Sequence, residues 1–269
     1  MRTAVVGHVE WIEFVPVEEV PRPGEIVHAA EPWEQAGGGG AVAAIQLGLL
    51  ADDVMLFTTL GDDELGRRAR AELEGLGVRV HAAVVDAPTC RAITYVDASG
   101  ERTITTLGPR LYPRGHDETL PWEEIARCDA AYFCAGDADA LLHARRARVL
   151  VATARELGTL RRAGVELDAL VGSGGDDAER YEGELDPDPR VVVSTSGPLG
   201  GWTRPGGPFS AALPSDPVVD AYGAGDCFAA GLAFALGRGT ELADAVSFAA
   251  RCGAEALTGR GVHAVALDL

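Results

Sequence analysis

Residues 220–228 read DAYGAGDCF, and they lead directly into the apolar run AAGLAFALG at residues 229–237. Gly223 and Gly225, with Ala224 between them, leave only small side chains where a backbone can approach a ligand closely. Because the run that follows has the composition of a buried helix, the free N–H groups of the turn lie at the positive end of a helix dipole. The stretch therefore predicts an anion-binding turn at the start of a helix.

Asp226 is the carboxylate that closes this turn. A carboxylate beside an anion site suits phosphoryl transfer to a hydroxyl, since it can accept the alcohol proton while the N–H groups hold the developing charge. The helix dipole stabilises a negative charge at that position, so we expect the pKa of Asp226 to stay low. A plain N-cap aspartate after a glycine turn has the same pattern, and spacing alone does not separate the two interpretations.

Outward from this stretch, apolar strands and helices alternate along the chain. Repeated units of this kind imply a mostly parallel sheet with helices on both faces. Strands are expected at 3–9, 54–59, 78–85, 130–134, 149–151, 167–171, 191–194 and 209–213, and helices at 41–50, 62–76, 138–146, 155–162, 226–236 and 241–257.

Two stretches do not fit that alternation. Residues 12–35 carry Pro16, Pro21 and Pro23 in their first part, which suits short or edge strands. Residues 89–108 contain two alternating segments joined by the turn DASG. The two stretches are able to pair as a small separate sheet. We therefore expect a β lid of residues 12–35 and 89–108 on an α/β core made of residues 1–11, 36–88 and 109–269.

The composition excludes several classes of protein. The chain has 269 residues and a net charge of −18 from 23 basic and 41 acidic residues, so nucleic acid and anionic membranes are poor partners. All of the basic residues are arginine, and the lack of lysine excludes a Walker A loop and Schiff-base chemistry. No dinucleotide-binding glycine motif follows the first expected strand, which argues against a dehydrogenase. With no signal peptide, no membrane span and five scattered cysteines, we expect a cytoplasmic protein.

The stretch DAYGAGDCF resembles the D-T-x-G-A-G-D-x-F signature of the ribokinase-like, or PfkB, family of carbohydrate and nucleoside kinases. Further resemblances follow in the family's order and cover nearly the whole chain. The resemblance implies an αβα sandwich with a mostly parallel central sheet, a small β lid, and an ATP-dependent kinase. The further matches are LGDDELG at 60–66, TYVDASGER at 94–102, TSGPLG at 195–200, and the last long helix with the glycine after it at 245–261.

The resemblance also implies roles for particular residues. Asp226 would be the general base, and Gly223, Ala224 and Gly225 would form the anion hole. The nucleotide would lie along Thr195, Gly197 and Gly200, together with Ala250, a position where many members carry a polar residue near the base. Asp220 would lie beside a bound monovalent cation such as K⁺.

The substrate side departs from the family pattern. Counted from Gly7, the position of the family's substrate-binding aspartate is Ile12. Glu10 lies two residues earlier, on the same face of an extended strand, whereas Glu13 points to the opposite face. We therefore hypothesise that Glu10 takes over acceptor binding.

Two other family motifs are altered. The glycine stretch that contains Gly37, Gly38 and Gly39 normally ends in an asparagine that contacts sugar hydroxyls, and Gly39 or Gly40 stands in its place. The family's N-x-x-E motif, which organises Mg²⁺, corresponds to residues 173–176, with Asp176 as the acidic member and Ser173 as a weaker oxygen donor. A plain surface turn explains that segment equally well.

These observations predict an ATP- and Mg²⁺-dependent kinase that phosphorylates a hydroxyl of a sugar or sugar derivative. A nucleoside acceptor is the nearest alternative. A member that has lost turnover and binds a nucleotide or sugar as a sensor is the other, and the altered positions Ile12, Gly39 and Ser173 favour it. The intact turn at Asp226 favours the enzyme. The expected partner is a sugar-like molecule, with a homodimer formed through the β lid as a further hypothesis.

Overall fold

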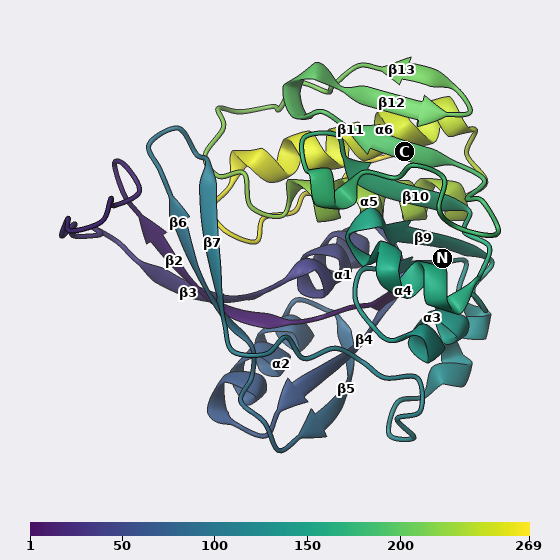
Figure 1. The fold of residues 1–269 in the computed structure, drawn as a ribbon, viewed down its shortest axis with the longest axis horizontal. Helices are drawn as coiled ribbons and strands as arrows, with labels where there is room; N and C mark the ends of the chain where they lie inside the picture. The colour runs from purple at the N-terminus through teal and green to yellow at the C-terminus, as the bar shows by residue number, and fades with distance from the viewer.

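The computed structural model describes all 269 residues and contains a nine-stranded sheet and a separate four-stranded sheet (Figure 1). The strand order of the large sheet is β13-β12-β11-β10-β9-β8-β1-β4-β5. All neighbouring pairs from β5 to β11 are parallel, and only the pairs β11–β12 and β12–β13 are antiparallel. Its strands are β1 (Arg2–Val6), β4 (Asp53–Gly61), β5 (Arg79–Val85), β8 (Ala130–Phe133), β9 (Val149–Thr153), β10 (Ala169–Ser173), β11 (Val192–Thr195), β12 (Gly201–Arg204) and β13 (Gly207–Phe209).

Helices cover both faces of this sheet, because successive residues of its buried strands point to opposite sides. In β1, Val5 belongs to one apolar core and Ala4 and Val6 belong to the other. The first core is closed by α1 (Gly39–Leu50), α5 (Ala224–Gly237) and α6 (Leu242–Glu255), and the second by α3 (Ala138–Ala144), α4 (Leu157–Ala163) and the 3₁₀ turn η1 (Trp122–Arg127). Shorter 3₁₀ turns are η2 (Ala154–Glu156), η3 (Asp177–Glu179), η4 (Gly197–Leu199) and η5 (Ala256–Thr258).

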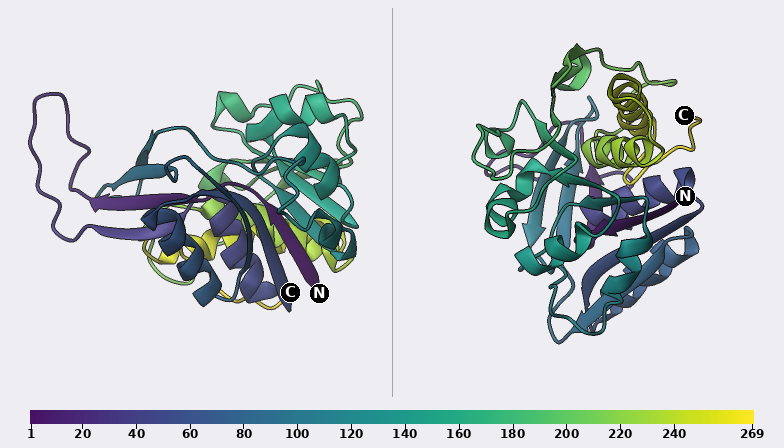
Figure 2. Two further views of the ribbon diagram at one scale, coloured as in Figure 1. Left: turned by 90° about the horizontal axis from the view of Figure 1, so that it is seen from below. Right: turned by 90° about the vertical axis from the view of Figure 1, so that its right-hand side faces the viewer.

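The four-stranded sheet, called the lid below, projects from the side of the sandwich (Figure 1). Its strands are β2 (Glu10–Pro16), β3 (Trp33–Gly37), β6 (Arg91–Val96) and β7 (Arg102–Leu107), in the order β3-β2-β6-β7. The central pair β2 and β6 is parallel, and the outer pairs are antiparallel. Figure 2 shows the segment between β2 and β3 reaching away from the body of the protein.

The lid has an inner and an outer face. On the inner face, Phe14 stacks on Trp33 at 4.8 Å and meets the edge of Tyr222 at 5.1 Å, between ring centroids. On the outer face, the guanidinium of Arg68 covers Trp11 and lies 4.3 Å from the ring centroid. Arg68 belongs to α2 (Glu64–Gly75). The inner face of the lid is therefore the one that meets the segment leading into α5.

The motif at residues 60–66 explains how the lid is anchored to the core. Asp63 caps α2 by accepting the N–H of Gly66 at 2.8 Å. It also accepts the N–H and the hydroxyl of Thr89, both at 2.7 Å, just before β6 begins. A side chain at Gly61 would collide with the carbonyl of Ala87, with its Cβ at 2.3 Å. The motif therefore ties the start of α2 to the base of the second lid hairpin.

The expected fold class, a mostly parallel αβα sandwich with a small separate sheet, is confirmed. The strand expected at 209–213 is wrong, because the chain pairs at 207–209 with β12 instead and forms an antiparallel edge hairpin. The helix expected at 155–162 begins as the 3₁₀ turn η2 before it becomes α4. None of the helices has the length and the apolar character that crossing a membrane requires.

Candidate active site

The turn before α5 has the geometry that its glycines predict. Gly223 is the N-cap residue and has a φ of 78°, in the left-handed region that glycine adopts at little cost. A side chain there would also meet Val42, with its Cβ at 2.9 Å from a methyl carbon. The first intrahelical hydrogen bond runs from the N–H of Cys227 to the carbonyl of Gly223 at 2.9 Å. The N–H groups of residues 224–226 precede this bond and remain available to a ligand.

The carboxylate of Asp226 lies half-buried beside these N–H groups. Its Oδ1 accepts the phenol of Tyr132, from β8, at 3.1 Å. Burial raises the pKa of Asp226, and the Tyr132 hydrogen bond and the charges of Arg102 and Arg155 only partly oppose this effect. The expectation of a low pKa is therefore wrong, because the loss of hydration outweighs the favourable helix terminus.

The glycine stretch before α1 packs directly against this carboxylate. A Cβ at Gly39 would lie 2.9 Å from Oδ1 of Asp226. Gly38 donates its N–H to the hydroxyl of Tyr222 at 2.8 Å, and a Cβ at Gly37 would lie 2.9 Å from the same hydroxyl. The structure therefore brings the two predicted glycine motifs together, although almost 190 residues separate them in the sequence.

Glu10 and Ile12 point to the inner face of the lid, where they have different surroundings. The side chain of Ile12 is fully buried in the core and packs on Gly37. Glu10 is 6% exposed, and the only partner of its carboxylate is the thiol of Cys90 at 3.5 Å. Burial raises the pKa of Glu10. Glu13 lies on the outer face, paired with Arg91, as expected.

His8 also lines this region, at the point where the chain leaves β1. Its Nε2 accepts the N–H of Gly39 at 3.3 Å, so the ring proton is on Nδ1, which is buried and has no partner in the protein. Burial, with the nearby charges of Arg110 and Arg155, lowers the pKa of His8 to about 3. The imidazole is therefore neutral at physiological pH.

Close to residues 173–176, the segment expected to organise Mg²⁺, lies a carboxylate that sequence reasoning missed. Asp176 caps η3 through the N–H of Ala178 at 2.9 Å and pairs with Arg155 at 3.2 Å. Glu179 accepts the N–H of Ser173 at 2.9 Å and also pairs with Arg155. The sequence offered one signal for Glu179, because the spacing from Ser173 to Asp176 repeats from Asp176 to Glu179.

The predicted nucleotide-binding residues divide into two groups. Thr195, Gly197 and Gly200 follow one another at the carboxyl end of β11, and Thr195 donates its hydroxyl to the carbonyl of Gly172 at 3.3 Å. Gly200 has a φ of 85°, and a Cβ there would lie 2.1 Å from the carbonyl oxygen of Phe209. Ala250 lies instead inside α6, packed in the first apolar core.

Asp220 is buried between two backbone segments. One carboxylate oxygen accepts the N–H of Tyr222 and the other accepts the N–H of Gly261, both at 2.8 Å. Both oxygens therefore have protein donors, and no group of three or more His, Cys, Asp or Glu side chains is placed to hold a metal ion anywhere in the chain. These contacts explain Asp220 as a clamp between the segment before α5 and the segment after η5.

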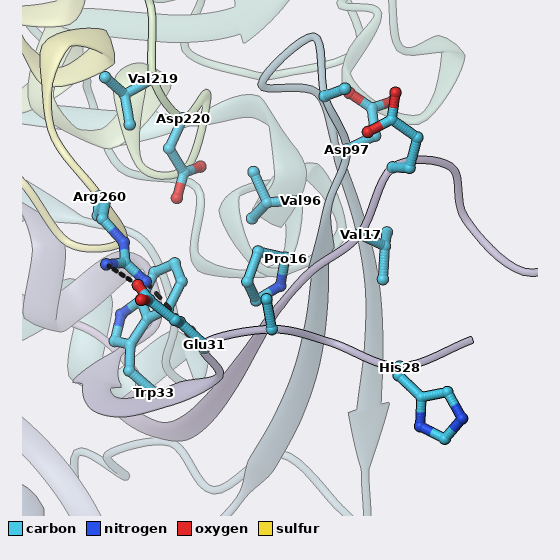
Figure 3. A pocket seen from close by; sticks show the side chains of 13 residues that line it. Pro16, Val17, His28, Glu31, Trp33, Val96, Asp97, Val219, Asp220 and Arg260 are labelled. Atoms are coloured by element: carbon cyan, nitrogen blue, oxygen red, sulfur yellow. Dashed lines mark hydrogen bonds and ion pairs between the residues drawn. The ribbon is translucent and has the colours of Figure 1, made fainter.

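A cavity of 490 Å³ opens next to Asp220, between the lid and the segment that precedes β3 (Figure 3). Within it, Arg260 lies over the ring of Trp33 at 4.1 Å and pairs with Glu31 at 3.8 Å. Neither Asp226 nor the glycine stretch lines this cavity. The candidate active site at Asp226 is therefore separate from this cavity.

The tip of the lid contacts the residue that follows Asp220. Ala221 donates its N–H to the carbonyl of Gly100 at 2.9 Å, and its own carbonyl accepts Nη1 of Arg102 at 2.9 Å. The lid hairpin and the turn before α5 are thus joined by two hydrogen bonds.

Fold and site together define a class of protein, an α/β sandwich that holds a half-buried carboxylate at a glycine turn, next to a small β sheet. Over residues 2–165 and 165–268 the sequence matches the family described as pfkB family carbohydrate kinase. The chain belongs to that family, which confirms the resemblance seen at residues 220–228, and it is a phosphotransferase whose acceptor is a hydroxyl group.

Individual relatives agree with this assignment. The chain is 27% identical over 286 residues to the ATP-dependent ribose-1-phosphate kinase of Halopiger xanaduensis, covering 94% of this chain and 91% of that protein. It is 29% identical over 265 residues to the aminoimidazole riboside kinase of Salmonella typhimurium, covering 84% and 82%. The ribokinase structure from Thermotoga maritima shares the fold, with a TM-score of 0.76, 21% identity, and coverage of 97% of this chain and 94% of that one.

Proposed function

We propose that this protein transfers the γ-phosphoryl group of ATP to a hydroxyl of a sugar or sugar derivative. The observation that supports this most strongly is the half-buried carboxylate of Asp226 beside the free N–H groups of residues 224–226. The relative in Halopiger xanaduensis is ATP-dependent by name, and the proposal carries that cofactor over to this chain.

In the proposed reaction, Asp226 accepts the proton of the attacking hydroxyl. The N–H groups of Ala224 and Gly225 hold the negative charge that develops on the transferred phosphoryl group. Burial raises the pKa of Asp226, and a base with a pKa nearer neutrality takes a proton from an alcohol more effectively. With no lysine in the chain, the nearby positive charges are Arg102 and Arg155.

Mg²⁺ fits the donor set at the end of β10. Magnesium in kinases is held by one or two carboxylates together with phosphate oxygens and water. Asp176 and Glu179 supply two carboxylates, and Ser173 supplies a hydroxyl, in one short segment. We propose that Glu179 binds the metal together with Asp176 and Ser173. When bound with the nucleotide, the ion neutralises phosphate charge. The K⁺ ion expected beside Asp220 stays a prediction, since both oxygens of that carboxylate accept backbone N–H groups.

For the acceptor, we propose that the carboxylate of Glu10 binds hydroxyls of the sugar. A buried carboxylate with a thiol as its only partner retains most of its capacity to accept hydrogen bonds. The riboside named for the Salmonella typhimurium relative favours a nucleoside-like acceptor as a second candidate. The buried position of Ile12, where the family places its aspartate, favours the sensor alternative.

The test is a coupled ADP-release screen against pentoses, hexoses, ketoses, sugar acids and nucleosides, run on wild type and Asp226→Asn. The asparagine has nearly the same shape and its amide oxygen can still accept the Tyr132 hydroxyl, but it cannot accept the alcohol proton. We expect the rate to fall by about 10² to 10⁴ while ATP binding persists. Retention of more than about a tenth of kcat would refute Asp226 as the base, and ATP binding with no turnover on any acceptor would favour the sensor.

A further inference from the structure

Tyr132 is the one side chain that makes a hydrogen bond to the proposed base, and neither the family signature nor the sequence analysis pointed to it. It lies in β8 and is 2% exposed. Its hydroxyl donates to Oδ1 of Asp226 at 3.1 Å and has no other hydrogen-bond partner in the structure. A phenol buried at this depth needs a partner, and it has found the carboxylate that the proposed reaction uses.

We propose that Tyr132 is a positioning residue for Asp226, an inference that rests on the proposed role of Asp226 as the base. The hydrogen bond anchors Oδ1, and Gly39 closes over the same oxygen, since a Cβ there would lie 2.9 Å from Oδ1 and 3.4 Å from Oδ2. Oδ2 makes no hydrogen bond within the protein and is the oxygen left to accept the hydroxyl proton. Tyr132 thereby selects which lone pair faces the acceptor.

Whether the hydrogen bond raises or lowers the pKa of Asp226 depends on which of the two groups carries the proton. Burial and the charge of Asp226 raise the pKa of the Tyr132 phenol well above its ordinary value, so the phenol stays protonated and donates. A donated hydrogen bond favours the charged carboxylate and lowers the pKa of Asp226 against the effect of burial. Removing the hydroxyl must therefore raise the pKa of Asp226 further.

Other ionisable groups that influence Asp226 remain when the Tyr132 hydroxyl is removed, so the shift isolates one contact. They come from seven places along the chain around the carboxylate, whereas α1 contributes only the backbone of Gly39. They are Arg102 of β7, Arg155 of η2, Glu179 of η3, Cys134 after β8, Glu10 of β2, Tyr222 before α5, and Cys227 of α5 itself.

The test is the substitution Tyr132→Phe, which keeps the ring and removes the hydroxyl. The pH midpoint of the Asp226 titration is measured by NMR on protein labelled with ¹³C at the aspartate carboxyl carbon. The Asp226 signal is assigned by its loss in Asp226→Asn. We expect the midpoint to rise by about one pH unit, the equivalent of a hydrogen bond to a charged group. The acid limb of kcat/KM should move up by the same amount, with the KM for ATP unchanged.

Tyr181→Phe is the matched control, because Tyr181 donates to Asp188 at the surface and its loss should leave Asp226 unmoved. An unchanged Asp226 midpoint in folded Tyr132→Phe overturns the inference. Should that variant not fold, the ring Cζ resonance of Tyr132 in the wild-type protein reports the same contact, and its chemical shift must change with the midpoint of the Asp226 titration. A Cζ shift that does not change with that midpoint also overturns the inference. These titrations need no acceptor, so they fail or succeed independently of the kinase assay with Asp226→Asn.

Discussion

Gly39→Ala tests how closely the two glycine motifs must approach. The new methyl group would lie 2.9 Å from Oδ1 of Asp226, whereas ordinary contact begins near 3.4 Å. The carboxylate must therefore withdraw by about half an ångström, which disturbs the hydrogen bond that the same oxygen accepts from Tyr132 at 3.1 Å. Misplacing a reacting group by about 1 Å costs on the order of 10² in rate, so we expect kcat to fall about tenfold.

The folded state should tolerate this change. Gly39 is the first residue of α1, where alanine is a better helix former than glycine, and the N–H that binds His8 is kept. Gly75→Ala is the matched control, since a methyl group there meets no atom within 4 Å. The assay is ADP release with the acceptor found in the screen, alongside thermal unfolding. Wild-type kcat in Gly39→Ala, with an unchanged melting temperature, would refute the close approach described for Asp226.

Two further predictions concern the acceptor and the metal. Glu10→Gln should raise the KM for the acceptor about 10- to 100-fold, the cost of a hydrogen bond to a charged group, and leave ATP affinity unchanged. Glu13→Gln, on the outer face of the lid, is the control. Equal KM values in the two variants would contradict acceptor binding by Glu10. Asp176→Ala should raise the Mg²⁺ concentration for half-maximal activity by about tenfold. Asp177→Ala, which loses only a surface ion pair with Arg180, should leave that concentration unchanged. Magnesium titrations of wild type and Asp176→Ala that superimpose would show that residues 173–176 are only a loop.

Much of the fold could be predicted because local patterns decided it. The alternation of apolar runs predicted the parallel sheet, and the glycine turn at 223–225 predicted where α5 begins. The β12–β13 hairpin was missed because its strands are only four and three residues long and rich in glycine and proline. Strands that short carry too little periodicity to be recognised.

The candidate site was only half predictable, for a different reason. The glycine stretch at 37–40 and the turn from Gly223 to Asp226 are each continuous in sequence, so each could be recognised there. Tyr132 reaches the site from β8 and Arg155 from the turn η2, and nothing local distinguishes them from core and surface residues. The pKa of Asp226 was misjudged because burial is a property of the assembled fold. The lid as a separate domain, the lid-mediated dimer, Mg²⁺ binding and the cytoplasmic location stay predictions.

The two hydrogen bonds at Ala221 connect the lid mechanically to the turn before α5. Ala221 is bound by Gly100 and Arg102 at the lid tip and stands two residues before Gly223. An outward swing of the lid hairpin must therefore either break these bonds or carry the backbone of the turn with it. If the bonds hold, opening of the lid in the proposed kinase also displaces the N–H groups proposed to bind phosphate, so that anion site is complete only when the hairpin is closed.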